Sequence, residues 1–372
     1  MIVTLDATPL LGRRTGIGRY VEQLLAVLPA ALGRRGLGGD DTVRVSTWTA
    51  RGGRVEGLPP GVRQTGVRVP ARLVRTLWQH GDRPAVERLV GRTDVFHGTN
   101  FVSPPTRRAR EVVTVHDLTY LHHAATVSAA SLAYRELVPR ALDRGAHVVT
   151  PSRTVAAAVR AEYDLPEDRV TATPLGVDAA WFRAAEPPTD PGGPAGPTGL
   201  GPDGDYLVFV GSLDPRKNLP RLLAAYADLR QRVPDAPTLV LAGPAGRERD
   251  LAERPGVRLT GWLDDDALRR LVAGARALVL PSLDEGFGLP VLEALAAGRP
   301  VVAADIPAVR EVAGPHALLA PPTDVEALGA ALEAVLDAPD DAAARRARRE
   351  WASGWTWDRC ADLTVEAYLG AG

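Results

Sequence analysis

Cysteine, lysine and long apolar runs are scarce in this sequence of 372 residues. The single cysteine, Cys360, excludes an internal disulfide and a cysteine-rich zinc site. No stretch of about 18 uninterrupted apolar residues occurs, which argues against a membrane-spanning helix. The chain opens on an apolar run, MIVTLD, without a basic leader, so we expect a cytoplasmic protein. A formal net charge of −1 gives no global electrostatic reason to bind nucleic acid.

The scarcity of lysine is more informative than the other absences, because Lys217 is the single lysine among 44 basic residues. Such a bias is typical of a GC-rich coding sequence and says nothing about the fold. A lysine retained against this bias indicates a position that needs a compact ammonium on a flexible stem, which a planar guanidinium does not reproduce. Retention by chance is the alternative.

Short apolar runs alternate with longer amphipathic segments, which is the pattern of parallel sheets covered by helices. The alternation occurs twice and is interrupted by a stretch dense in proline and glycine, residues 186–204. We therefore predict an α/β protein with two facing, doubly wound, Rossmann-like domains, residues 1–185 and 205–353, joined by a linker over 186–204. Two such domains imply a cleft between them.

The predicted strands fix where ligands should bind. In the first domain they cover residues 2–6, 42–48, 94–97, 112–116, 148–151 and 170–174, and in the second residues 206–210, 238–242, 257–260, 277–281 and 300–303. Ligands of doubly wound sheets bind beyond the carboxyl ends of the strands. The loops of interest therefore follow Asp6, His116, Val210, Thr260 and Pro281.

The segment PSLDEGFGLPVLEALAAGRPVV, residues 281–302, carries the strongest functional signal. Free N–H groups of its glycine turn, at the positive end of a predicted helix, suit a diphosphate. Gly286 and Gly288 permit a ligand to approach the backbone. Glu285 and Glu293, with seven residues between them, offer carboxylates to the hydroxyls of a hexose and a ribose, respectively. A surface glutamate pair beside a capped helix is the alternative.

A second candidate is LVFVGSLDPRKNLPRLL, residues 207–223, in which an apolar strand runs through Gly211 into a polar loop. The loop places Arg216 and Lys217 side by side at the start of a predicted helix. Two cations at this end oppose the helix dipole unless an anion is bound. A diphosphate would resolve the conflict, and the cations would neutralise charge on a departing nucleotide. Solvated surface charges are the alternative.

Two weaker candidates lie in the first domain. His116 ends an apolar strand within EVVTVHDLTYLHH, residues 111–123, where it would donate a hydrogen bond to a sugar hydroxyl or act as an acid or base. A satisfied core histidine is the alternative. Gly16 and Gly18 stand at a loop-to-helix junction that resembles a phosphate-cradling turn, although a plain turn is as compatible with this spacing.

Two charged segments have simpler explanations. Asp264, Asp265 and Asp266 would suit a divalent metal, but they also precede a predicted helix, so we favour capping and expect no metal site. Residues 51–92 contain nine arginines and three acids, with Leu73, Leu77 and Trp78 as an apolar stripe on a predicted helix. This segment faces an acceptor or a membrane surface, or it is a solvated face with a buried stripe, which we favour.

Together these motifs resemble those of the retaining GT-B glycosyltransferases with a Glu-x7-Glu signature, the group 1 or family 4 transferases. The likeness covers nearly the whole chain and rests on segments that stand in the family's order: DVFHGTN (94–100), TVHDLTY (114–120), VTPSRT (149–154), TPLGVD (173–178), VGSLDPRKNL (210–219) and EGFGLPVLEALAAGRPVV (285–302).

The resemblance implies that the C-terminal domain holds a nucleotide diphosphate sugar and the N-terminal domain an acceptor. It also implies that a last helix, within residues 354–372, crosses back onto the first domain. Catalytic roles fall to His116, Arg216, Lys217 and Glu285, with His116 near the 6-position of the sugar. Many relatives carry an arginine where this chain has Ser212, and Arg216 would substitute for it. Donor-binding roles fall to Gly16, Gly18, Gly211, Ser212, Gly261, Trp262, Gly286, Phe287, Gly288, Leu289 and Glu293.

The same resemblance implies transfer of a hexose with retained configuration, without a protein nucleophile, metal or cofactor. The PRKN loop favours a GDP-mannose-like donor, with a UDP-glucose-like donor next. The acceptor would be a hydroxyl of a saccharide, a lipid-linked saccharide or a natural product, with peripheral membrane contact as an option. A nucleotide-sugar 2-epimerase and a non-catalytic nucleotide-sugar-binding member are the rival interpretations.

Overall fold

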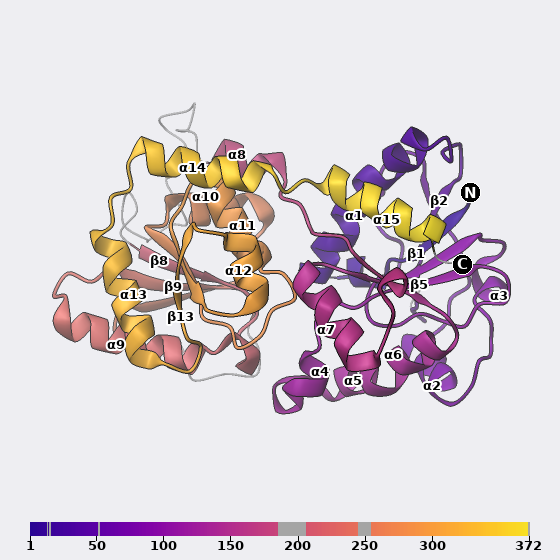
Figure 1. Cartoon of the computed structure of the whole chain (residues 1–372), viewed down its shortest axis with the longest axis horizontal. Coiled ribbons are helices and arrows are strands. Elements are labelled where there is room, and N and C mark those ends of the chain that lie inside the picture. The colour runs from indigo at the N-terminus through magenta and orange to yellow at the C-terminus, as the bar shows by residue number, and fades with distance from the viewer. Residues whose placement is uncertain (13, 15, 51–52, 185–205, 245–253, 371–372) are drawn as a thin grey trace. The chain divides into compact units, whose positions relative to one another are not determined.

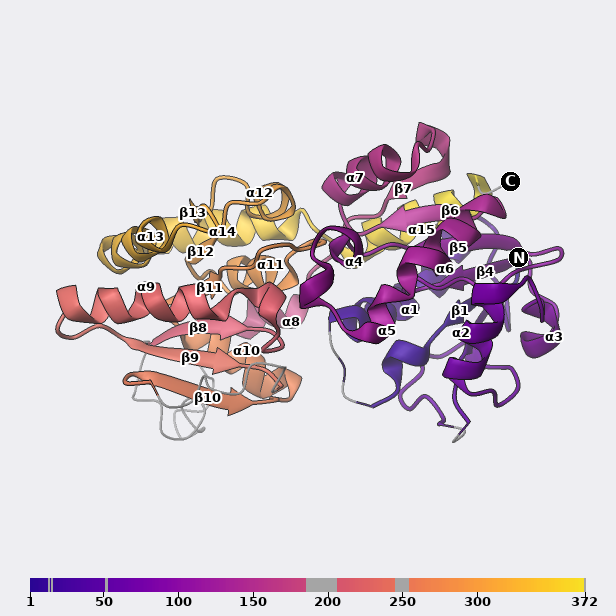
Figure 2. The same cartoon turned by 90° about the horizontal axis from the view of Figure 1, so that it is seen from below.

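The computed structural model describes residues 1–12, 14, 16–50, 53–184, 206–244 and 254–370. These residues form two compact units, one made of Met1–Gly176 with Thr356–Gly372 and the other of Val177–Trp355. The predicted linker, residues 186–204, lies outside the described residues. Figures 1 and 2 show a sheet in each unit with helices on both of its faces.

The first unit contains a seven-stranded parallel sheet of order β3-β2-β1-β4-β5-β6-β7. Its strands are β1 (Val3–Asp6), β2 (Val43–Ser46), β3 (Val62–Gln64), β4 (Val95–Gly98), β5 (Arg110–Thr114), β6 (His147–Thr150) and β7 (Val170–Ala172). Its helices are α1 (Gly16–Arg34), α2 (Ala71–His80), α3 (Glu87–Val90), α4 (Thr119–His122), α5 (Ala129–Leu132), α6 (Tyr134–Asp143), α7 (Arg153–Tyr163) and α15 (Trp357–Gly370).

The second unit contains a six-stranded parallel sheet of order β10-β9-β8-β11-β12-β13. Its strands are β8 (Tyr206–Val210), β9 (Thr238–Ala242), β10 (Val257–Gly261), β11 (Ala277–Leu280), β12 (Val301–Ala304) and β13 (Ala317–Ala320). Its helices are α8 (Ala179–Ala184), α9 (Leu219–Arg232), α10 (Asp265–Gly274), α11 (Leu289–Ala296), α12 (Pro307–Ala313), α13 (Val325–Asp337) and α14 (Ala342–Ser353).

Apolar strands buried on both faces explain why the sequence folds into these two sheets. The run YLVFV of β8 and the run ALVL of β11 are buried at every position. Parallel strands with helices on both sides require such continuous apolar runs. The predicted fold class, two doubly wound Rossmann-like sheets, is confirmed. The sequence missed β3 and β13, which are short and only partly buried.

The last helix, α15, packs on the first unit beside α1, as Figure 1 shows. Arg34 of α1 donates to the carboxylate of Asp362, with Nη2 and Oδ1 2.8 Å apart. In the interior, the hydroxyl of Tyr368 lies 2.7 Å from Nδ1 of His97 on β4. The predicted return of the C-terminal helix to the first unit is confirmed. No helix in the described ranges is long and apolar enough to cross a bilayer.

The face that α2 buries differs from the predicted one. Trp78 and Val74 are 1% exposed, whereas Leu73 and Leu77 are 51% and 43% exposed. Two apolar stripes, each spaced by four residues, therefore occur on this helix, and only one can face the core. The prediction of a buried stripe was right for Trp78 and wrong for Leu73 and Leu77.

We predict that Gly176→Ala destabilises the first unit. A Cβ at Gly176 would lie 2.2 Å from the backbone nitrogen of Trp357, where α15 begins. Overpacking of this kind costs about 1–3 kcal/mol. Urea denaturation of the full chain, followed by circular dichroism, measures the loss.

Gly33→Ala is the matched control, because a Cβ at Gly33 in α1 meets no atom within 4 Å. Alanine is the better helix former, so this variant should gain about 0.5–1 kcal/mol. Equal unfolding midpoints for the two variants would contradict the close packing at Gly176.

Candidate active site

The predicted site of the second unit lies where the strand order of its sheet reverses. β8 has β9 on one side and β11 on the other, so the loops that follow β8 and β11 diverge from neighbouring strand ends. This switch point is the usual ligand-binding position of a doubly wound sheet. The loop after β8 carries Arg216 and Lys217, and the loop after β11 carries Glu285.

A buried cluster of three charged side chains joins these two loops. Nζ of Lys217 lies 2.5 Å from Oε1 of Glu285, and Nη1 of Arg216 lies 3.0 Å from Oε2. Ser282 donates its hydroxyl to the same carboxylate at 2.6 Å. The side chains of Lys217 and Glu285 are only 9% and 8% exposed, and that of Arg216 is 24% exposed. The structure thus brings together three residues that the sequence singled out separately.

Backbone and amide hydrogen bonds fix the relative position of the two loops. The N–H of Leu283 donates to the carbonyl of Arg216 at 2.9 Å. The amide Nδ2 of Asn218 donates to the carbonyls of Pro281 at 2.9 Å and Pro322 at 2.7 Å. Asn218 has a left-handed backbone with φ of 59°, a conformation that asparagine tolerates better than most residues. Sequence reasoning missed Asn218, although its place between Lys217 and the first residue of α9 was visible.

The ionisation of Glu285 is set by its two cationic neighbours. Burial alone would raise the pKa of its carboxyl group. The charges of Lys217 and Arg216, with hydrogen bonds from Lys217 and Ser282, outweigh burial and lower this pKa to about 2. Glu285 is therefore a carboxylate at neutral pH. Its negative charge offsets part of the positive charge that a diphosphate would otherwise find there.

Glycines at the strand ends keep the backbone of this region closely packed. The N–H of Gly243, after β9, donates to the carbonyl of Gly261 at 3.0 Å. A Cβ at Gly243 would lie 1.9 Å from the carbonyl oxygen of Gly211, so only glycine fits beside the loop after β8. Gly211 itself leaves room for Lys217, whose Cε would lie 3.3 Å from an added Cβ.

The remaining donor-binding candidates of the second unit occupy the same edge of the sheet. Gly288 has φ of 97° and immediately precedes α11, whose first turn contains a proline. Glu293 is 2% exposed in the second turn of that helix. Trp262, directly after β10, is 44% exposed. Of the other predicted residues, Ser212, Gly286 and Phe287 stand in these same loops, and Leu289 is the first residue of α11.

His116 lies at the corresponding strand ends of the first unit, two residues after β5. Its Nε2 is 2.9 Å from the carbonyl oxygen of Thr99, so this nitrogen carries the proton. The rings of Tyr20 and Phe101 contact it edge-on, with centroids 5.3 Å and 5.4 Å away. Burial lowers the pKa of His116, which favours the neutral ring. A neutral His116 has Nδ1 as an acceptor, and its predicted roles as a hydrogen-bond donor to a sugar hydroxyl or as an acid or base stay predictions beside the alternative of a core histidine.

Gly16 and Gly18 begin α1 after the loop that follows β1. A Cβ at Gly18 would lie 2.9 Å from the carbonyl oxygen of Pro9, so close packing is enough to explain why a glycine stands there. A Cβ at Gly16 would meet no atom within 4 Å. Residues 13 and 15 lie outside the described part of the chain, so the phosphate-cradling interpretation of this turn stays a prediction.

The acidic run at residues 264–266 caps a helix. The side chain of Asp264 accepts the N–H of Ala267 at 2.8 Å, at the first turn of α10. The capping prediction is confirmed. Among the described residues, no group of three or more histidine, cysteine, aspartate or glutamate side chains has the arrangement of a metal site.

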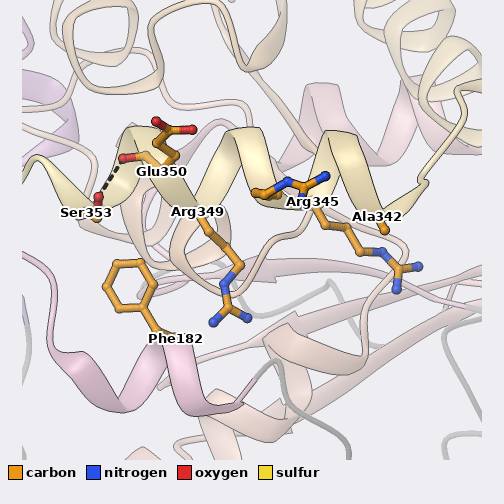
Figure 3. A pocket seen from close by; sticks show the side chains of 7 residues that line it. Phe182, Ala342, Arg345, Arg349, Glu350 and Ser353 are labelled. Atoms are coloured by element: carbon orange, nitrogen blue, oxygen red, sulfur yellow. Dashed lines mark hydrogen bonds between the residues drawn. The ribbon is translucent and has the colours of Figure 1, made fainter.

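A pocket elsewhere in the second unit does not contain the predicted residues. It lies between α8 and α14, where Figure 3 shows Arg349 beside Phe182. The guanidinium carbon of Arg349 is 5.9 Å from the ring centroid. The other lining residues stand on the exposed side of α14 and are Ala342, Arg345, Arg346, Glu350 and Ser353. The chemistry of the switch point, and not the size of this pocket, identifies the candidate site.

Comparisons with known proteins match both halves of the chain. Residues 204–338 match the family described as Glycosyl transferases group 1, and residues 14–181 match that described as Glycosyltransferase Family 4. The O-antigen chain mannosyltransferase B of Escherichia coli is 31% identical over 289 residues, which cover 74% of this chain and 74% of that protein.

Solved structures resemble the whole chain at low sequence identity. Sucrose-phosphate synthase from Thermosynechococcus elongatus is similar with a TM-score of 0.72 and 21% identity, covering 99% of this chain and 98% of that one. HepE of Anabaena, solved in complex with UDP and glucose, is similar with a TM-score of 0.70 and 18% identity, covering 99% of each chain. These likenesses show the GT-B fold.

We predict that the carboxylate of Glu285 makes stability depend on acid pH. Its pKa of about 2 lies below the ordinary value of 4.5. A lowered pKa stabilises the folded state above the unfolded pKa, and this stability disappears as the pH falls from about 5 towards 2. The full effect is about 3 kcal/mol, of which most is lost by about pH 3.

Urea denaturation of the wild type and of Glu285→Gln between about pH 6 and pH 3 isolates this contribution. The wild type should be the more stable at pH 6, and the difference should shrink as Glu285 becomes protonated. A difference that stays constant over this range would contradict the ion-paired carboxylate.

Proposed function

Because this chain belongs to the group 1 glycosyltransferases, we propose that it moves a hexose from a nucleotide diphosphate sugar to a hydroxyl acceptor, with retained configuration and without a metal. The observation that carries the proposal is the cluster of Arg216, Lys217 and Glu285 at the switch point of the second sheet. Two cations in a largely buried place suit an anion of two charges or more.

The diphosphate would take the place that Glu285 now occupies beside the cations. Lys217 and Arg216 would hold phosphate oxygens, supported by N–H groups at the start of α11. Glu285, released from the cations, would accept hydrogen bonds from the hexose hydroxyls, and Glu293 from the ribose hydroxyls. The exposed Trp262 and the backbone of Gly261 would meet the base.

Retention without a protein nucleophile requires that the donor itself takes part. The bond between the anomeric carbon and the diphosphate oxygen breaks, and the acceptor oxygen bonds to the same face of that carbon. The proton of the acceptor hydroxyl passes to the leaving phosphate oxygen. Lys217 and Arg216 stabilise the negative charge that grows on the leaving diphosphate, and such electrostatic stabilisation is usually the largest single contribution to catalysis.

Two donors agree with the similarities. A mannosyltransferase relative favours a GDP-mannose-like donor. A structural neighbour solved with UDP and glucose supports a UDP-glucose-like donor. We rank GDP-mannose-like first because the relative is the closer in sequence. The acceptor is a saccharide, lipid-linked saccharide or natural-product hydroxyl, and we place the reaction in the cytoplasm.

We predict that Lys217→Ala lowers turnover by about 100- to 1000-fold, as the loss of one charged donor at a developing anion does elsewhere. The assay follows release of nucleoside diphosphate from each of the two donors with a panel of saccharide acceptors. Arg346→Ala, which removes an exposed arginine of α14, is the control and should keep wild-type turnover. Full activity of Lys217→Ala would contradict the assignment.

We predict further that the product keeps the anomeric configuration of the donor and that EDTA leaves the rate unchanged. Proton NMR of the first product formed gives the configuration directly. An inverted product would exclude the same-face displacement, and a rate abolished by EDTA and restored by Mg²⁺ would exclude metal independence. Conversion of the donor sugar in the absence of any acceptor would favour the 2-epimerase.

A further inference from the structure

The outer side of α2 exposes more apolar surface than its place in the fold requires. Leu73 and Leu77 lie four residues apart on one side of the helix and are 51% and 43% exposed. Val67, just before the helix, is 51% exposed. Large apolar side chains exposed together are unusual on the surface of a soluble unit and indicate an interaction surface. We call these three residues, with Arg68 and Arg72, the α2 surface.

The sequence around these side chains is basic. From residue 57 to residue 81 the sequence contains four arginines and no aspartate or glutamate. Arg68 and Arg72 are exposed and form no ion pair within the described part of the chain. Apolar side chains among unpaired cations are complementary to a partner with an anionic surface layer and an apolar interior. An anionic lipid bilayer has this composition.

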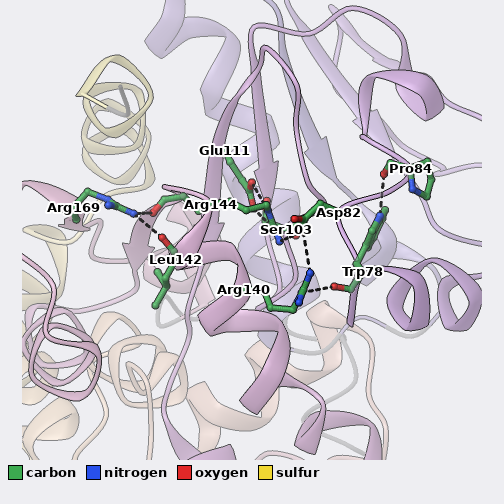
Figure 4. A network of polar contacts seen from close by, with 10 residues as sticks. Trp78, Asp82, Pro84, Ser103, Glu111, Arg140, Leu142, Arg144 and Arg169 are labelled. Atoms are coloured by element: carbon green, nitrogen blue, oxygen red, sulfur yellow. Dashed lines mark hydrogen bonds and ion pairs between the residues drawn. The ribbon is translucent and has the colours of Figure 1, made fainter. Parts of the chain in front are cut away.

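The inner side of α2 is fixed, so the α2 surface is presented on a rigid support. Nε of Arg140 on α6 donates to the carbonyl of Trp78 at 2.9 Å, and Nε1 of Trp78 donates to the carbonyl of Pro84 at 3.1 Å. Figure 4 shows this network continuing through Asp82 to Arg144. Asp82, the acidic residue that follows α2 most closely in the sequence, pairs with both Arg140 and Arg144. These arginines offset its negative charge.

The α2 surface lies on the same helix as a residue close to the ligand-binding edge of the first sheet. Burial raises the pKa of Asp6, at the carboxyl end of β1, and the positive charge of Arg75 on α2 opposes that rise. The charge of Arg75 thus acts on a strand end where the acceptor is expected. We propose that Val67, Leu73, Leu77, Arg68 and Arg72 dock the protein on anionic lipid bilayers. The proposal does not depend on the identity of the donor.

Sedimentation of the full-length protein with vesicles tests the proposal. Vesicles of phosphatidylcholine with phosphatidylglycerol should carry the wild type to the pellet at low salt, and vesicles of phosphatidylcholine alone should not. Binding should weaken as salt screens the arginines. Arg68→Ala with Arg72→Ala should lower the partition coefficient about 25-fold, at about fivefold for each charge.

Leu73→Ser with Leu77→Ser separates apolar insertion from charge and should lower the partition coefficient while leaving the charge unchanged. Leu318→Ser with Arg346→Ala, which alters exposed residues of the second unit, is the control and should bind as the wild type does. Thermal unfolding, together with UDP and GDP binding, confirms that each variant is folded. A wild type that stays in the supernatant, or α2 variants that sediment like the wild type, would overturn the proposal; the first result would leave an acidic protein as the partner.

Discussion

The attraction between the ammonium of Lys217 and the carboxylate of Glu285 is the interaction on which the candidate site depends. Both groups are buried, and either charge without the other would destabilise the fold through its loss of hydration. Their pairing makes a cationic loop and an acidic loop mutually stabilising. Under the proposed function it would also keep the cations near the diphosphate site, so that a donor would exchange one anion for another in a site that is already assembled.

The parallel sheets explain why this cluster can form. Strand order reverses beside β8 and β11, so the loops that follow them leave the sheet next to each other. Asn218 then joins these loops to the segment after β13 through its amide hydrogen bonds. Gly243 permits the backbone of Gly211 to lie close by. The geometry of the charged groups thus rests on the topology first, and on a few residues that fix the loops second.

The sequence predicted features that depend on local pattern more completely than it predicted individual contacts between distant residues. Buried strands such as β8 are continuous apolar runs, and the cap made by Asp264 depends on a residue three positions away, so both were predicted correctly. The sequence assigned the loops of Lys217 and Glu285 to a diphosphate, but it did not predict the direct ion pair between them, because these residues are 68 positions apart and no spacing rule reveals the contact. The prediction that Leu73 and Leu77 are buried was wrong, because α2 carries two apolar stripes. Only the packing of Trp78 decides which of the two faces the core.

Calorimetric titration of UDP and GDP into the wild type and Glu285→Gln tests the central claim most directly. If the diphosphate replaces the Glu285 carboxylate beside Arg216 and Lys217, removal of that negative charge should strengthen nucleoside diphosphate binding by about tenfold or more. The corresponding nucleotide sugars should gain less, because the variant would lose the carboxylate that accepts hydrogen bonds from the hexose hydroxyls in the proposed complex. Unchanged or weaker diphosphate binding by Glu285→Gln would show that the cation–carboxylate cluster is not the diphosphate site.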